Sequence, residues 1–172
     1  MDTLHASRCT LEPQVSQHAA EMFRVLSDPA IYEFENAPPP SQAWLEERYR
    51  RLESRKSPDG SEHWLNWVVR LPSGELAGYV QATLRQSGCA YIAYELSSAY
   101  WRKGIGKCAV EAMLQELGRS YGVFEFVAVL KARNFRSMAL LRSLGFTPAD
   151  AAQHQHRIDE IAMSKSAPAE PG

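Results

Sequence analysis

The stretch LSSAYWRKGIGKCAVEAMLQEL, residues 96–117, decides the fold that we expect for this chain. An apolar strand pattern ends at Leu96, a basic glycine turn follows at residues 102–107, and a helical pattern begins directly after the turn. Glycines permit a tight bend and a close approach to a ligand. The start of a helix directs free N–H groups and a positive dipole end toward the same place. The order of strand, basic turn and helix therefore predicts a phosphate-binding site.

Length and composition are those of an ordinary globular protein. The chain has 172 residues, of which 45% are hydrophobic and 23% charged, and this size fits one domain. Nineteen basic and 20 acidic residues leave a net charge of -1, which gives no global field to attract nucleic acid or a membrane. No apolar window approaches a membrane span, and Cys9, Cys89 and Cys108 are not in metal-ligand spacing. We expect a cytoplasmic protein without a metal, a membrane partner or a nucleic-acid partner.

The first half of the chain predicts a strand, two helices and a three-stranded meander. Residues 3–11 fit one short strand, and the apolar residues that follow Gln14 fall on one helical face. Residues 31–40 contain three prolines and predict an ordered loop, after which Ser41 can cap a second helix. Alternating apolar residues between positions 64 and 96, interrupted by short turns, then predict three antiparallel strands.

A crossover unit follows the meander. The helical pattern of residues 105–117 is expected to end near Gly118 or Gly122. The apolar run VFEFVAVL, residues 123–130, is typical of a central strand that is covered on both faces. A strand, a helix and a strand in this order place the second strand parallel to the one that ends at Leu96.

The C-terminal part predicts one more helix and two more strands. The helix begins after Asn134 and ends at Gly145. One strand is expected directly after that glycine and another within residues 158–163. We expect a single domain over residues 1–164 and a flexible tail over residues 165–172, which are rich in Ser, Ala and Pro.

Two separated motifs resemble one family. The segments YELSSAYWRKGIGKCAVEAM (residues 94–113) and ARNFRSMALLRSLGF (residues 132–146) are similar to the GNAT superfamily of acetyl-CoA-dependent N-acetyltransferases. The chain looks most like the branch of the ribosomal-protein N-terminal acetyltransferases (RimJ/RimL-like). The first segment matches the family's Arg/Gln-x-x-Gly-x-Gly/Ala turn, and the second matches the Asn-x-x-Ser…Leu-Gly-Phe helix of that branch. The resemblance implies an α/β (α+β) fold with a mixed, mostly antiparallel central sheet, a splayed parallel strand pair and helices on both faces.

The resemblance also implies a site for acetyl-CoA as the acetyl donor. Amides of the glycine turn would hold the pyrophosphate, and the strand pair would part at Leu96 and Ser97 so that main-chain groups can pair with pantetheine. An N–H near Leu96 would polarise the acetyl carbonyl. Asn134 would contact the pantetheine arm and Ser137 would approach the sulfur. The expected cofactor-binding residues are Leu96, Ser97, Arg102, Lys103, Gly104, Ile105, Gly106, Lys107, Asn134 and Ser137.

The implied reaction is direct acetyl transfer to a primary amine, of a protein N-terminus or a small molecule, in a ternary complex. The amine must lose a proton, and a base that accepts it adds about 10²- to 10⁴-fold to the rate. The candidate catalytic residues are Glu95, Ser137 and His156. Strand alternation leaves open that Glu95 faces away from the cleft. His156 can equally be a solvated histidine, and the Ser137 hydroxyl can bond to its own backbone.

Two positions depart from the family pattern. Trp101 stands where the superfamily often has Gln or Arg, and Leu141 stands where many relatives place a tyrosine that protonates the leaving thiolate. The missing acid leaves a second interpretation open, a non-catalytic acyl-CoA-binding or regulatory module on the same fold. Glu33 and Glu35 can line the acceptor entrance and attract a cationic amine. The identity of the amine, the length of the acyl group and a homodimer stay open at this point.

Overall fold

The computed structural model describes residues 1–85, 87–150, 154 and 156–167. Within these residues the strands form one eight-stranded sheet in the order β1-β2-β3-β4-β5-β6-β8-β7. The strands are β1 (Leu4–His5), β2 (Thr10–Pro13), β3 (Glu62–Arg70), β4 (Leu76–Arg85), β5 (Cys89–Leu96), β6 (Glu125–Lys131), β7 (Thr147–Pro148) and β8 (Glu160–Ser166). The helices are α1 (Ala19–Val25), α2 (Gln42–Leu52), α3 (Ile105–Tyr121) and α4 (Phe135–Ser143).

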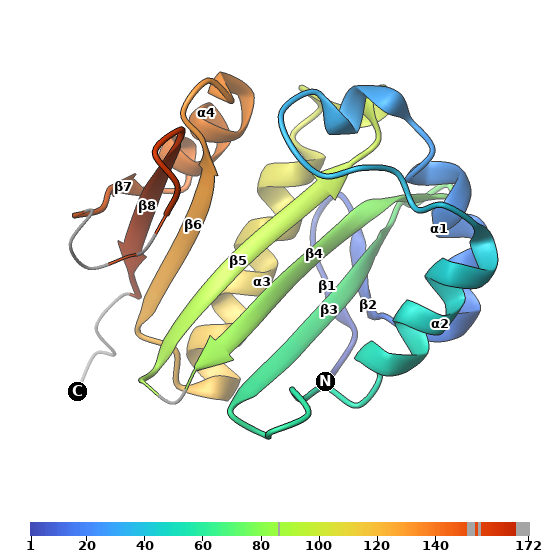
Figure 1. Cartoon of the computed structure of the whole chain (residues 1–172), viewed down its shortest axis with the longest axis horizontal. Helices are drawn as coiled ribbons and strands as arrows, with labels where there is room; N and C mark the ends of the chain where they lie inside the picture. Colours follow the sequence, from blue (N-terminus) through green and yellow to red (C-terminus); the bar gives the residue numbers. More distant parts are fainter. Residues whose placement is uncertain (86, 151–153, 155, 168–172) are drawn as a thin grey trace.

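Helices cover both faces of this sheet (Figure 1). Successive residues of a strand point to opposite faces, so β3 supplies two separate clusters. Trp67 and Val69 belong to the main core with α3, whereas Val68 packs in a second cluster with α1 and α2. All strand pairs are antiparallel except β5 with β6, which are parallel. The predicted fold class is therefore confirmed.

The parallel pair opens shortly after it begins. Cys89–Tyr91 of β5 pair with Glu125–Val127 of β6, and no later residue of either strand continues this pairing within the described chain. Instead β5 stays paired with β4 as far as Leu96, and β6 stays paired with β8 along its whole length. In Figure 1 the two strands diverge toward α4. The predicted splay is present, and it begins at Tyr91, five residues earlier than the strand end.

The N-terminal segment differs from its prediction. Residues 3–11 do not form a single strand: β1 and β2 pair with each other as an antiparallel hairpin, and the N–H of Ala6 donates to the carbonyl of Cys9 at 3.0 Å. The connecting residues contain neither glycine nor proline, so the sequence carries no turn signal there. The hairpin places β2 between β1 and β3 in the sheet.

The structure shows where α3 and β8 end. Helix α3 passes through Gly118 and ends at Gly122, whose left-handed φ of 64° and N–H bond to the Leu117 carbonyl are typical of a glycine C-cap. Strand β8 continues through Ser166, so the last strand extends into the segment that we expected to be a tail. The N–H of Ala167 still donates to the carbonyl of Phe124 at 2.8 Å. Residues 168–172 of the expected tail lie outside the described residues.

Gly78 provides a test of how closely β4 and β5 approach. A Cβ at this position would lie 2.0 Å from the main-chain oxygen of Glu95. We expect Gly78→Ala to lower the free energy of unfolding by an overpacking cost of about 1–3 kcal/mol on top of its positive-φ cost. Gly74→Ala is the matched control, because its φ is also positive and nothing lies within 4 Å of its Cβ. Urea unfolding that gives equal losses for the two variants would contradict this packing.

Candidate active site

Two hollows meet where β5 and β6 part. The α3 hollow has a volume of about 660 Å³ and lies between the turn before α3 and the start of α4. The sheet hollow has a volume of about 560 Å³ and lies between the loop of residues 31–40, α2 and the strands β3 to β6. The residues that line both hollows are Ile31, Phe34, Tyr94, Glu95, Asn134 and Ser137. These six residues therefore form the junction of the two spaces.

The turn before α3 has the features of an anion site. Gly104 adopts a left-handed φ of 75° at the N-cap, and it offers no side-chain cap, so the first N–H groups of α3 remain unbonded within the helix. Cations surround this end of the α3 hollow, from the turn itself and from the start of α4: Arg102, Lys107, Arg133 and Arg136. Positive charge and free amides together favour a phosphate-bearing ligand.

Gly106 has a second reason to be glycine. A Cβ at this position would lie 3.0 Å from Cδ1 of Leu140 and 3.7 Å from Cδ1 of Leu96. The first turn of α3 therefore packs closely against the Leu140 side chain of α4 and the Leu96 side chain at the end of β5. Sequence reasoning assigned the glycines of this turn to a tight bend and a close approach to a ligand, and it could not find the contact with α4, which is long-range.

Seven of the ten predicted cofactor-binding residues line the α3 hollow: Leu96, Arg102, Gly104, Gly106, Lys107, Asn134 and Ser137. Ile105 points into the core instead, and Lys103 is exposed with its Nζ 5.7 Å from the ring centroid of Tyr100. Arg133 and Arg136 were missed by the sequence analysis, although both belong to the quoted second motif. Cζ of Arg136 lies over the ring of Trp101, 3.5 Å from its centroid. Trp101, which departs from the family pattern, is therefore part of this site.

The main-chain groups at the end of β5 divide between two neighbours. The N–H of Ser97 donates to the carbonyl of Ala77 at 2.9 Å, and its hydroxyl donates to Asp28 at 3.3 Å. The expectation of a free N–H at Ser97 is therefore wrong, because alternation turns this residue toward β4. The main-chain groups of Leu96 point away from β4. Its carbonyl accepts a hydrogen bond from the Trp101 indole at 2.9 Å. Since the N–H and C=O of a strand residue share one side, the N–H of Leu96 faces the opening.

Glu95 faces the junction, which settles the question left by strand alternation. Its Oε1 accepts a hydrogen bond from Nδ2 of Asn36 at 3.0 Å, and its side chain lines both hollows. Burial raises the pKa of this carboxyl above its ordinary value. Hydrogen bonds from Tyr79 and Asn36 oppose the rise, and the nearby charge of Glu35 adds to it. A carboxyl with a raised pKa beside a cavity is suited to accept a proton.

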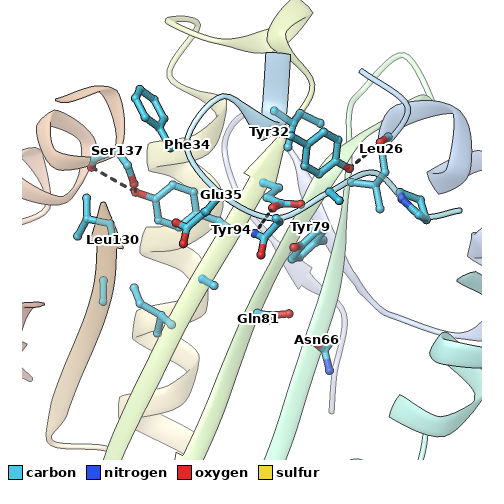
Figure 2. Close-up of a pocket in the computed structure, with 18 of the residues that line it drawn as sticks. Leu26, Tyr32, Phe34, Glu35, Asn66, Tyr79, Gln81, Tyr94, Leu130 and Ser137 are labelled. Atoms are coloured by element: carbon cyan, nitrogen blue, oxygen red, sulfur yellow. Dashed lines mark hydrogen bonds between the residues drawn. The ribbon is translucent and has the colours of Figure 1, made fainter. Parts of the chain in front are cut away.

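Ser137 uses its hydroxyl on another residue and not on its own backbone. Its N–H donates to the side-chain oxygen of Asn134 at 3.1 Å, which caps α4. Its Oγ lies 2.6 Å from the hydroxyl oxygen of Tyr94, across the opening (Figure 2). The sequence had suggested a core or interface position for Tyr94 and left an aromatic-lined acceptor pocket as an alternative. No signal in the sequence identifies this contact, because the predicted parting point was Leu96 and Ser97, whereas the β5–β6 pairing ends at Tyr91.

His156 is not at this site. Its Nδ1 lies 3.0 Å from the carbonyl oxygen of Arg157, and the residue lines neither hollow. It precedes β8, which pairs with β6 on the side away from β5. The interpretation of His156 as a solvated residue fits this placement.

The acidic residues of the loop have different roles. Glu35 lines the sheet hollow, and burial raises its pKa, with a further rise from the charges of Glu160 and Asp159. Glu33 instead pairs with Nη2 of Arg136 at 3.1 Å. Glu33 and Glu35 were both expected at the acceptor entrance, but only Glu35 lines the sheet hollow.

The described part of the chain contains neither a metal-binding cluster nor a membrane-spanning helix. Nowhere in residues 1–85, 87–150, 154 and 156–167 do three His, Cys, Asp or Glu side chains gather so as to hold a metal ion. In the same ranges, no helix combines the length and apolar character that crossing a membrane requires.

The family model described as an acetyltransferase (GNAT) domain matches residues 8–147. The chain belongs to the GNAT acetyltransferases. A curated relative, the uncharacterized N-acetyltransferase p20 of Bacillus licheniformis, is 24% identical over 148 residues, which are 85% of this chain and 83% of that protein. This match agrees with the family assignment, and the predicted class of enzyme is confirmed.

Solved structures share this GNAT fold over nearly the whole chain. RimL, a ribosomal L7/L12 alpha-N-protein acetyltransferase in complex with coenzyme A, has a TM-score of 0.80 at 15% identity, with 96% of this chain and 98% of that chain covered. RimJ of Mycobacterium smegmatis, in complex with CoA-disulfide, has a TM-score of 0.77 at 19% identity, with 99% and 90% covered. These neighbours belong to the predicted branch. The predicted donor, acetyl-CoA, is confirmed for the family.

Gly106 allows a direct test of the phosphate turn. We expect Gly106→Leu to weaken acetyl-CoA binding at least tenfold in calorimetric titration, because its side chain would meet Leu140 and Leu96 and distort the first turn of α3. Gly118→Ala on the same helix is the control, since its Cβ would make only an ordinary contact of 3.8 Å with the Val123 carbonyl. The control should keep its affinity and gain about 0.5–1 kcal/mol of stability. Unchanged affinity in a folded Gly106→Leu protein would exclude the turn as the binding site.

Proposed function

We propose that this protein transfers the acetyl group of acetyl-CoA directly to a primary amine, with both substrates bound at once. The observation that supports this is the shared junction of the two hollows. Acetyl-CoA would occupy the α3 hollow with its thioester at the junction, and the amine would approach from the sheet hollow. Bringing two substrates together in this way supplies much of the rate in such reactions.

The donor side follows from charge and main-chain direction. The amides at the start of α3 and the flanking cations would hold the pyrophosphate. The Leu96 N–H, which faces the opening, would donate to the thioester carbonyl and stabilise the negative charge that develops on its oxygen. RimL and RimJ, which share this fold, are solved in complex with coenzyme A and with CoA-disulfide, and this supports coenzyme A as the ligand.

The acceptor side favours an amine with hydrogen-bonding groups. Asn66 and Gln81 lie opposite each other on β3 and β4, and both line the sheet hollow (Figure 2). Among the described residues, Nε2 of Gln14 and the hydroxyl of Tyr49 have no hydrogen-bond partner, although both residues are buried and line this hollow. Buried polar groups without partners are costly. A protein N-terminus, as in the name of RimL, and a small polar amine both meet this requirement.

Glu95 is the proposed base. It would take the proton from the attacking nitrogen as the C–N bond forms and the C–S bond breaks. The electron pair of that bond leaves on sulfur, and the thiolate is stabilised at Ser137.

The deciding experiment is turnover on a panel of acceptors. Release of free CoA thiol should exceed the rate without acceptor for at least one class among N-terminal peptides, polyamines, amino sugars and amino acid amides. Acetyl-CoA should also raise the melting temperature. If acetyl-CoA raises the melting temperature and no amine is acetylated, the chain is a binding module and the enzyme proposal fails.

Glu95→Gln should lower kcat by about 10²- to 10⁴-fold, the contribution typical of a general base. In the wild type the rate should rise as the pH increases through the pKa of Glu95, which lies above the ordinary carboxyl value. In Glu95→Gln this rise of the rate with pH should be absent. His156→Gln is the comparison and should keep both rate and profile, because His156 lines neither hollow.

The same variant has a second expected effect, on stability. A carboxyl whose pKa is raised by folding stabilises the native state below its unfolded pKa, and this stabilisation is lost as the pH rises through the folded pKa. Glu95→Gln cannot ionise, so its melting temperature relative to the wild type should increase from acid to neutral pH. A constant difference across this range would show that Glu95 is not held in a desolvated site.

A further inference from the structure

One side-chain contact spans the opening that the sheet leaves between β5 and β6. Tyr94 extends from the part of β5 that no longer pairs with β6, and its hydroxyl oxygen lies 2.6 Å from Oγ and 3.3 Å from the carbonyl oxygen of Ser137 on α4 (Figure 2). No other hydrogen bond to the Ser137 hydroxyl occurs among the described residues. Tyr94 is therefore the group that determines where this hydroxyl points.

The contact lies at the place where the reaction must occur. Tyr94 and Ser137 both line the α3 hollow and the sheet hollow. If acetyl passes from a donor in one hollow to an amine in the other, which is the proposed function on which this inference rests, the sulfur leaves beside this pair. Leu141 is fully buried and has no hydrogen to donate to it.

Either hydroxyl can be the donor in the 2.6 Å contact between Tyr94 and Ser137. Burial raises the pKa of Tyr94 to about 12, so its hydroxyl stays protonated and can donate. The acceptors within its reach are the Oγ and the main-chain oxygen of Ser137. When the phenol donates to Oγ, the serine hydrogen is left free to point into the junction, and a hydroxyl that accepts one bond donates the next more strongly.

We propose that Tyr94 is a positioning residue for the leaving group: it orients the Ser137 hydroxyl so that its hydrogen bonds to the departing thiolate of CoA. In this step the C–S bond breaks and its electron pair stays on sulfur, where the Ser137 O–H stabilises it by a hydrogen bond. No proton has to leave Tyr94. The proton released by the amine passes to Glu95 and solvent, and it balances the protonation of the thiolate when CoA departs. Tyr94 thus acts on the leaving group through Ser137 and does not replace the proton donor that position 141 lacks.

Tyr94→Phe removes the hydroxyl and keeps the ring. We expect kcat to fall about 10- to 100-fold, the range for a hydrogen bond to a charged group, with an unchanged KM for acetyl-CoA. Ser137→Ala should cause a similar loss, and the double variant should be no slower than Ser137→Ala alone. Tyr91→Phe is the matched control, because Tyr91 is on the same strand, bonds to His154 at 3.1 Å and lines neither hollow.

A second measurement does not depend on any amine. The thiol of unacetylated CoA can be titrated in its complex with the protein by the ultraviolet absorbance of the thiolate. The pKa of the bound thiol should be lower in the wild type and in Tyr91→Phe than in Tyr94→Phe and Ser137→Ala, whereas a purely structural role for Tyr94 would not move it. If Tyr94→Phe folds and leaves this pKa unchanged, the inference is overturned. If the pKa changes as expected and no amine is acetylated by the wild type, the positioning role stands and the proposed function fails.

Discussion

The structure depends on one constraint in its sheet: β5 and β6 share three paired residues and then cannot remain together. β5 is held by β4 as far as Leu96, and β6 is held by β8 as far as Lys131. Each strand keeps its other neighbour, while the edges that face each other part beyond Tyr91 and Val127. Unpaired main-chain groups in a protein interior need partners. The opening is thus a natural place for a ligand, and both hollows form along it.

Asp28 connects the turn that leads to α3 with the loop above the sheet hollow. Its carboxylate accepts from the N–H of Ser98 at 2.7 Å and from the N–H of Ala30 at 3.0 Å. The first bond holds the turn that leads to α3, and the second holds the start of the loop above the sheet hollow. Asn36, further along that loop, donates to Glu95. The loop, the strand end and the turn are therefore positioned by one short chain of hydrogen bonds.

The elements that were predicted correctly are those that carry their own local signals. Ser41 caps α2, and its Oγ accepts from the Trp44 N–H at 3.1 Å. Alternation predicted β3, β4 and β5, and the unbroken apolar run predicted β6 as a central strand. The hairpin of β1 and β2 was missed because its turn lacks glycine and proline. The main-chain role of Ser97 was assigned wrongly because only its pairing with Ala77 on β4 shows which way the strand turns.

The sequence by itself determined the family, the order of the elements and the glycine turn before α3, because each of these depends on residues close together in the chain. Only the tertiary structure decided which polar groups meet at the junction. Tyr94 and Ser137 are 43 residues apart, and Asn36 and Glu95 are 59 apart, so no local pattern connects either pair. The position of His156 was likewise decided by the tertiary structure, in which it lines neither hollow. Contacts of this kind follow from which strands pair and where they part, and that is a property of the folded sheet.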